Sequence, residues 1–221
     1  MKVSVIVENE NYLVVNKPSG IIVERSPHES DTLEHRVERY LSRGIANKMS
    51  FVGVVHRLDR VTSGAIIFAK NRNALKLFNE EIRAKRIRKT YLAIVENLPS
   101  EKAATLSHHL YKDQKNKKAI IYTEATKTTV PCKLSYRLLK TLGEGYLLEV
   151  RLFTGRFHQI RAQLAHIDCP IIADEKYGSK KDYPYIGKKL LFFFCATMNG
   201  PLGAIIRDLF GNISFNLLYM Y

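Results

Sequence analysis

Short apolar runs rich in β-branched and aromatic residues recur along this chain of 221 residues and limit its fold more than any other feature. The clearest runs are residues 3–7, 12–15, 65–69, 91–95, 146–152 and 213–217. In the run 146–152 every second residue is apolar, and charged Glu149 and Arg151 lie between apolar neighbours. This period of two predicts a strand with one buried face.

Three segments have helical periodicity instead. The first begins near Asp31, which stands three residues before Glu34 in the spacing of a capping box. An apolar stripe then follows at helical spacing. Its members are Leu33, Val37, Tyr40 and Leu41.

A second helix is predicted over residues 71–85 and a third after Thr154-Gly155. The second would bury Leu75, Phe78 and Ile82. The third carries an apolar face made of Phe157, Ile160, Leu164 and Ile167. His158 and Arg161 are three residues apart, so they project together from another side of this helix, which periodicity alone would assign to solvent.

The irregular mixture of many strands with few helices favours an α+β fold over a regular alternation of strands and helices. No internal repeat or flexible linker is apparent. We therefore expect a single domain over residues 1–221, with a mixed, mostly antiparallel sheet flanked by a few helices and an active-site cleft across the sheet.

The charge of the chain predicts a polyanionic partner. There are 35 Lys and Arg residues against 21 Asp and Glu, which gives a net charge of +14. Such an excess favours nucleic acid, and less strongly an anionic membrane surface. No apolar stretch is long enough to cross a membrane, and Glu8 and Glu10 interrupt any signal-peptide core, so a cytoplasmic protein is expected.

The cysteines give no sign of a metal site. Cys132, Cys169 and Cys195 lie far apart, without the paired spacing of a zinc site, and their odd number argues against a disulfide framework. We expect the three cysteines to be small buried residues.

The stretch HRLDRVTSG, residues 56–64, carries the strongest chemical signal. It places Asp59 between Arg57 and Arg60. Nearby cations favour the ionised form of a carboxylate, which can then act as a nucleophile or base. The arginines could also bind phosphate. Taken by itself, however, such a group is most often a solvated ion pair of little consequence.

This stretch resembles the signature of the RluA-type pseudouridine synthases, in which HRLD and TSG flank two variable residues. Three further stretches extend the resemblance over nearly the whole chain. They are residues 6–23 with their NKPSG turn, residues 89–97 around Tyr91, and GRFHQIRAQLAHIDCPIIADEKYG at residues 155–178. The chain is similar to the catalytic domain of the family, and we expect the family's optional N-terminal RNA-binding module to be missing.

Four positions depart from the family pattern. Gln163 and Cys195 stand where histidines are usual, and the first departure would alter an RNA-facing residue. Asp168 and Ala173 stand where glycines are usual. Both put backbone turns in question, because Asp and Ala tolerate positive φ less well than glycine.

The resemblance implies an enzyme that isomerises specific uridines in structured RNA, ribosomal or transfer RNA, to pseudouridine without a metal or cofactor. By this resemblance Asp59 is the essential carboxylate, Tyr91 stacks on the uracil, and Arg161 pairs with Asp59. The target base would be flipped out of the RNA stack, and Arg57 would fill the vacated space. The residues expected to bind RNA are His56, Arg57, Arg60, Lys89, Arg156 and His158. A monomer is expected.

Clusters of basic residues predict a surface that follows the phosphate backbone. Residues 70–89 contain eight Lys or Arg against two Glu, and residues 112–118 contain four Lys against one Asp. Two lysine pairs, Lys180-Lys181 and Lys188-Lys189, add to them.

Two other functions are compatible with the residues alone. One is a non-catalytic RNA-binding protein or assembly factor that has kept the fold. The other is a glycoside hydrolase or nucleosidase that uses Asp59. Such hydrolases need a second carboxylate, for which the two signatures offer only Asp174.

Overall fold

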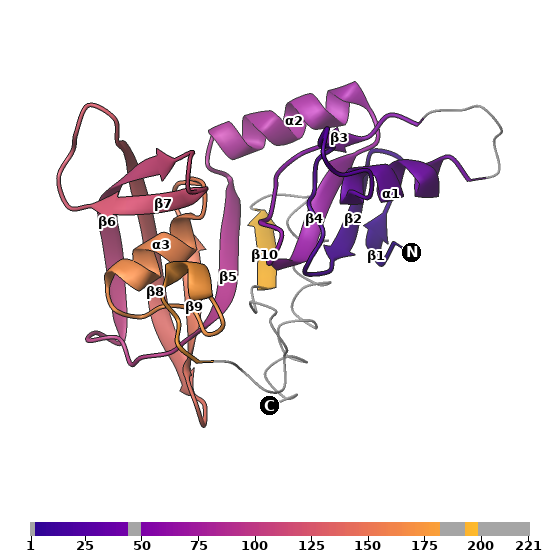
Figure 1. The fold of residues 1–221 in the computed structure, drawn as a ribbon. Coiled ribbons are helices and arrows are strands. Elements are labelled where there is room, and N and C mark those ends of the chain that lie inside the picture. The colour runs from indigo at the N-terminus through magenta and orange to yellow at the C-terminus, as the bar shows by residue number, and fades with distance from the viewer. Residues whose placement is uncertain (1–2, 44–49, 182–192, 199–221) are drawn as a thin grey trace. The chain divides into compact units, whose positions relative to one another are not determined.

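The structure is a computed structural model that describes residues 3–43, 50–181 and 193–198 (Figure 1). The chain forms two compact units. The first comprises Met1–Arg88 with Phe194–Tyr221, and the second comprises Lys89–Phe193.

The first unit is built on a small sheet. Its strands are β1 (Val5–Glu8), β2 (Tyr12–Lys17), β3 (Gly53–Val54), β4 (Ser63–Ala69) and β10 (Phe193–Met198). Their order is β1-β2-β4-β10, and β3 also pairs with β4. Strand β2 runs antiparallel to β4, and this register sets Lys17 opposite Gly64. The end of β2, where the NKPSG turn begins, therefore lies beside the start of β4, which directly follows the HRLDRVT segment.

Helix α1 (Leu33–Leu41) forms where the apolar stripe predicts it, but its N-cap is Thr32 rather than Asp31. The Thr32 hydroxyl accepts a hydrogen bond from the His35 amide at 3.2 Å. Asp31 lies one residue further out, and its carboxylate accepts a hydrogen bond from Arg36 Nε at 2.7 Å. The expected capping box between Asp31 and Glu34 is therefore wrong by one residue, because the threonine hydroxyl is better placed to satisfy an unpaired amide of the first turn.

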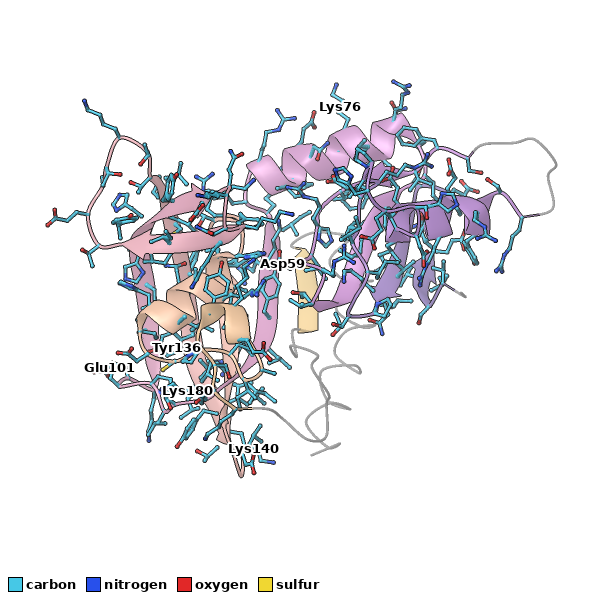
Figure 2. All side chains as sticks on the ribbon, in the orientation of Figure 1. Asp59, Lys76, Glu101, Tyr136, Lys140 and Lys180 are labelled. Atoms are coloured by element: carbon cyan, nitrogen blue, oxygen red, sulfur yellow. The ribbon has the colours of Figure 1, made fainter. Side chains whose placement is uncertain are left out.

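Helix α2 (Arg72–Arg83) confirms the second predicted helix. Its N-cap Asn71 accepts a hydrogen bond from the Ala74 amide at 2.8 Å. The helix packs against β3 and β4, and buried Phe78 meets the ring of Tyr12 edge to face at 5.7 Å. Its charged side chains, Lys76 among them, lie on the exposed side (Figure 2).

The second unit is a larger antiparallel sheet. Its strands are β5 (Ile87–Val95), β6 (Ala103–Asp113), β7 (Lys118–Tyr122), β8 (Val130–Thr141) and β9 (Tyr146–Leu152), in the order β5-β9-β8-β6-β7. Helix α3 (Gln159–His166) and the short 3-10 helix η1 (Glu175–Tyr177) lie on one face of it (Figure 1). The core on this face is a cluster of Leu110, Ala119, Cys132, Ala162 and Tyr177.

These elements confirm an α+β fold with a mostly antiparallel sheet. Strand β9 has the predicted bounds, and Leu148 and Val150 are buried while Arg151 is exposed. The long strands β6 and β8 are absent from the sequence prediction. The predicted strand at residues 213–217 lies outside the described residues. Within the described part, no helix is long and apolar enough to cross a membrane.

Asp168 and Ala173 both occupy the left-handed region, with φ of +57° and +64°. The turns that the family builds with glycine are therefore retained here with side chains present. A non-glycine residue in this region costs about 1–2 kcal/mol, so these two positions store strain on either side of the segment that carries Ile171 and Ile172.

We expect Ala173→Gly to raise the free energy of unfolding by about 0.5–1 kcal/mol. The relief of left-handed strain should exceed the extra entropy that glycine gains in the unfolded chain. Chemical denaturation of the purified chain measures the change. Ala84→Gly is the control, because Ala84 has a φ of −73° at the end of α2 and should gain nothing. Equal effects at the two positions would refute the strain.

Candidate active site

A buried lysine, Lys17, fixes the segment that carries Asp59 through hydrogen bonds to its backbone. Lys17 is fully buried, and its ammonium donates hydrogen bonds to three backbone carbonyls. These belong to Pro18 at 2.9 Å, Arg60 at 3.1 Å and Thr62 at 2.6 Å. An ammonium has three N–H donors. All three are used by one carbonyl of the NKPSG turn and two carbonyls of the segment 60–62 that follows Asp59.

The NKPSG turn makes further bonds to the same segment. The Ser19 hydroxyl donates to the Val61 carbonyl at 2.8 Å, and the Gly20 amide donates to the Arg60 carbonyl at 2.7 Å. The Thr62 amide closes a turn on the Asp59 carbonyl at 3.0 Å. Asp59 therefore lies in a backbone-fixed turn just before β4 (Figure 2).

Lys17 and Asp59 influence each other electrostatically. Burial lowers the pKa of Lys17 to about 8, and the Asp59 carboxylate opposes this shift. Lys17 is thus a cation that acts on Asp59 from within the first unit.

The two arginines beside Asp59 in the sequence have other carboxylate partners. Arg57 Nη1 donates to Glu24 at 2.8 Å, and Arg60 Nη1 donates to Glu29 at 3.0 Å. Both guanidinium groups are largely exposed, so solvent screens these pairs. In the structure each of these arginines is thus bonded to a carboxylate outside the motif, and its expected role beside Asp59 stays a prediction.

His56 is buried, and its Nε2 accepts a hydrogen bond from the Ile67 amide at 3.3 Å. This bond ties the start of the HRLD stretch to β4. It gives His56 a structural role, and its contact with RNA stays a prediction.

Arg161 is the central charge of the second unit. It is only 6% exposed, although periodicity alone would have assigned this side of α3 to solvent. Its Nε and Nη2 donate to the two carboxylate oxygens of Asp174 at 2.7 and 2.8 Å. Asp174 is 2% exposed, so this is a buried, bidentate ion pair.

His158 and Tyr177 complete the setting of Arg161. The expected neighbourhood of His158 and Arg161 is confirmed, since His158 Nε2 lies 3.2 Å from Arg161 Nη1. Arginine can only donate, so Nε2 must accept and the ring proton must lie on Nδ1. That proton points to the Tyr177 hydroxyl at 2.9 Å, which also accepts from the Ala119 amide at 2.8 Å. A continuous chain of bonds thus joins β7 to Asp174.

His158 is held in its neutral form. Burial lowers its pKa to about 3, and the positive charges of Arg161, Lys176 and Lys112 add to this effect. Its backbone has a φ of +50° at the N-cap of α3. The family's HQIR stretch therefore begins with a strained residue whose side chain is a hydrogen-bond acceptor for Arg161.

Tyr91, Lys89 and Arg156 also belong to the second unit. Tyr91 is buried on β5 opposite Val150. Burial lowers the pKa of Lys89. Arg156 is exposed, and its Nε donates to the Pro131 carbonyl at 3.2 Å.

Gln163 is fully buried, so the expectation that it faces RNA is wrong. Its Nε2 lies 3.3 Å from the Leu106 carbonyl and 3.1 Å from His108 Nδ1. Its Oε1 accepts from Gln159 at 2.9 Å. An amide fits this site because it can donate and accept at once, which ties α3 to β6. Cys195 lies on β10, where side chains are outside the description.

The roles of two residues that fix the candidate site were not predicted from the sequence. Lys17 ends a strand whose other buried residues, 12–15, are aromatic or aliphatic, and a lysine at such a position is a sign of a buried cation with specific partners. The sequence indicates Asp174 only as a possible second carboxylate, because its partner Arg161 lies 13 residues earlier on a helix. Among the described residues, no group of three or more His, Cys, Asp or Glu could hold a metal ion.

We expect Asp174→Ala to lower the free energy of unfolding by about 3–5 kcal/mol, because it leaves the Arg161 guanidinium buried without a counter-charge. Chemical denaturation measures the loss. Glu149→Ala is the matched control, since Glu149 forms a two-bond but exposed pair with Arg137 and should cost less than about 1 kcal/mol. Similar losses for both variants would contradict the assignment.

The depressed pKa of His158 predicts a pH dependence of stability. The unfolded chain takes up a proton on this residue near pH 6.5, whereas the folded chain takes it up only near pH 3. Stability linked to His158 is therefore complete above pH 6.5 and falls as the pH drops towards 3.

His158→Asn removes this titration, so the stability advantage of the parent over the variant should shrink between pH 6.5 and pH 3. Denaturant titrations at several pH values test this, with exposed His28→Asn as the control. A constant advantage across this range would show that His158 is not held neutral.

Comparisons with known proteins agree with the motifs. Residues 11–166 match the family model described as RNA pseudouridylate synthase. An uncharacterized RNA pseudouridine synthase of Chloroflexus aurantiacus is 35% identical over 80% of this chain and 55% of its own length. Ribosomal large subunit pseudouridine synthase C of Buchnera aphidicola is 35% identical over 79% of this chain and 54% of its own length. The chain thus spans about half the length of these relatives.

A solved structure shares the fold. Human RNA Pseudouridylate Synthase Domain Containing 1 superposes with a TM-score of 0.71 at 22% identity, covering 91% of this chain and 80% of that one.

Proposed function

Because the chain belongs to the RNA pseudouridylate synthase family, we propose that it converts specific uridines in structured RNA, ribosomal or transfer RNA, to pseudouridine. The observation that carries the proposal is the backbone-fixed turn that presents Asp59 within the complete HRLD–TSG motif. No cofactor is part of the proposal, since the reaction detaches and rejoins the same base.

Asp59 supplies the essential carboxylate. Lys17 and the NKPSG turn fix the backbone of residues 60–62 directly after it, so little ordering is needed when the substrate binds. A carboxylate in this position can attack the sugar or remove a proton from it, and either route breaks the bond between uracil and ribose. The base then turns and joins the ribose through carbon 5, which loses its proton, while nitrogen 1, freed from the ribose, gains one.

Arg161 is the proposed partner of Asp59. A guanidinium has five N–H donors, and the bonds to Asp174 and His158 use three of them. The pair with Asp174 therefore does not prevent Arg161 from binding a second carboxylate. Its role would be to orient Asp59 and keep it ionised with a charge that cannot be lost.

Tyr91 is proposed to stack on the flipped uracil, because an aromatic platform is a recurrent partner of extruded bases. Arg57 would leave its exposed pair with Glu24 and fill the space that the base vacates. Arg60, Lys89, Arg156, His56 and His158 are the remaining proposed RNA contacts. Neutral His158 can take part only as a hydrogen-bonding group or by positioning Arg161.

The alternative of a hydrolase with two carboxylates is weakened by the setting of Asp174. This residue is buried and bound on both oxygens by Arg161. A carboxylate that is buried and bound in this way is poorly placed to reach a substrate.

The proposal is tested with the purified chain and unmodified ribosomal and transfer RNA. Nucleosides released by digestion are separated by chromatography and pseudouridine is quantified. We expect pseudouridine to form, and Asp59→Asn to abolish it while RNA affinity stays within about twofold, since the carboxylate adds no attraction for phosphate. Asp31→Asn, an exposed carboxylate of the same unit, is the control.

Two results would contradict the proposal. Appreciable turnover by Asp59→Asn would remove the carboxylate from the mechanism. Release of free uracil without pseudouridine would identify a hydrolase instead.

A further inference from the structure

The sheet of the second unit has an outer face, opposite to α3, that carries cations around an exposed aromatic ring. Lys133 on β8 and Arg151 on β9 are exposed there, and Phe153 follows β9 directly. The Phe153 amide donates to the Lys133 carbonyl at 3.1 Å, so the two residues are cross-strand neighbours. We call Lys133, Arg151 and Phe153 the outer platform.

Phe153 is 37% exposed, so part of its ring is open to solvent. The guanidinium of Arg151 lies 5.0 Å from its ring centroid, and Lys133 Nζ lies 5.6 Å from it. Both distances are within reach of a cation–π interaction. The ring is thus kept at the surface with two positive charges beside it.

Within the described residues, neither Lys133 nor Arg151 forms a salt bridge with a carboxylate. Other exposed arginines of the described part do form one, namely Arg57, Arg60, Arg86 and Arg137. Glu149 is two residues from Arg151 on the same strand, but it is bound to Arg137 at 2.7 Å. The cross-strand neighbours of Lys133 and Arg151 on this face are the hydroxyl residues Ser107 and Ser135. The local charge is therefore positive and not compensated.

The same face continues towards a second aromatic site. Tyr122 pairs with His109 and His109 with Pro131, which lies two residues from Lys133. Tyr122 is 40% exposed and Tyr111, on the same face, is 36% exposed. Tyr122 and Phe153 are separated by three strand spacings, about 14 Å across the strands, and by a shift of two residues along them. This is a span of a few nucleotides of extended single strand.

We propose that the outer platform binds single-stranded RNA outside the catalytic site. One base stacks on Phe153, Lys133 and Arg151 bind the flanking phosphates, and Tyr122 offers a stacking position further along the strand. This inference deepens the proposed function, on which its choice of RNA rests, by assigning a contact to RNA that flanks the target uridine. Exposed rings interleaved with cations fit a polyanion with π-faces, and stacking on them does not depend on base identity.

The probe is a fluorescently labelled 12-nucleotide RNA of adenine and cytosine only, which contains no uridine to modify. Its affinity for the full chain is measured by fluorescence anisotropy at several salt concentrations. We expect Phe153→Ala to weaken binding roughly 5-fold to 100-fold, the range for the loss of one stacked base. Phe153→Tyr should bind like the parent. Leu98→Ala, an exposed apolar residue elsewhere in this unit, is the control.

The charges are tested by the double variant Lys133→Gln with Arg151→Gln. For single strands each lost phosphate contact reduces the slope of log K against log salt by about 0.7, so the slope should flatten by about 1.4. Lys102→Gln with Lys140→Gln removes the same charge from exposed positions that lie outside the platform and outside the predicted phosphate-binding clusters, and it should flatten the slope less. Circular dichroism and melting temperatures confirm that each variant is folded.

The inference is overturned if the parent does not bind this RNA, if Phe153→Ala binds like Leu98→Ala, or if the two double variants have the same slope. Because the probe cannot be a substrate, these outcomes are independent of turnover. Binding without pseudouridine formation on natural RNA would refute the proposed function and leave the platform standing.

Discussion

The ion pair between Arg161 and Asp174 organises the second unit. A guanidinium removed from water is tolerated only when a counter-charge and further hydrogen-bond acceptors are in place. Asp174 supplies two of these acceptors and His158 a third. To accept this bond His158 must be neutral and must carry its proton on Nδ1. The Nδ1 proton then needs an acceptor of its own, which is the Tyr177 hydroxyl. Tyr177 in turn is held by the Ala119 amide of β7, so one buried charge connects α3, η1 and the sheet.

The first unit also contains a buried cation whose N–H groups are all hydrogen-bonded, but here it is a lysine. Lys17 presents three N–H groups from one nitrogen, and these fit three carbonyls that converge from the NKPSG turn and the segment 60–62. A planar guanidinium could not reach three convergent oxygens from one atom, whereas it suits the two parallel oxygens of Asp174. Lysine and arginine thus each suit the geometry of their site. Lys17 fixes the segment that carries Asp59, and the ion pair with Asp174 fixes Arg161 itself.

The elements with a strong local pattern could be predicted from the sequence. Strand β9 has a clean period of two, and helices α1 and α2 have caps and apolar stripes. The strands β6 and β8 could not be predicted, because their outer faces are polar and their inner faces include His108, Cys132 and Tyr136 rather than a continuous aliphatic row.

For the candidate site, the sequence motifs propose residues but do not give the pairings that the structure shows. The motifs identify Asp59, Tyr91 and Arg161, and a short spacing along α3 identifies the contact of His158 with Arg161. Partners that are distant in sequence could not be found in this way. Glu24 lies 33 residues from Arg57, and Lys17 bonds to a carbonyl 45 residues away. Those pairings depend on which strands are neighbours, and a local motif does not contain that information.

We propose that Asp59 and Arg161 act together in the reaction, with Asp174 holding the arginine in place. A double-mutant cycle tests it most directly, with Asp59→Glu and Arg161→Lys measured singly and together by the single-turnover rate of pseudouridine formation. Residues that act as a unit give strongly non-additive losses. The account predicts that the double variant is no slower than the slower single variant. Losses that multiply in the double variant would show that the two residues act independently and would contradict the claim.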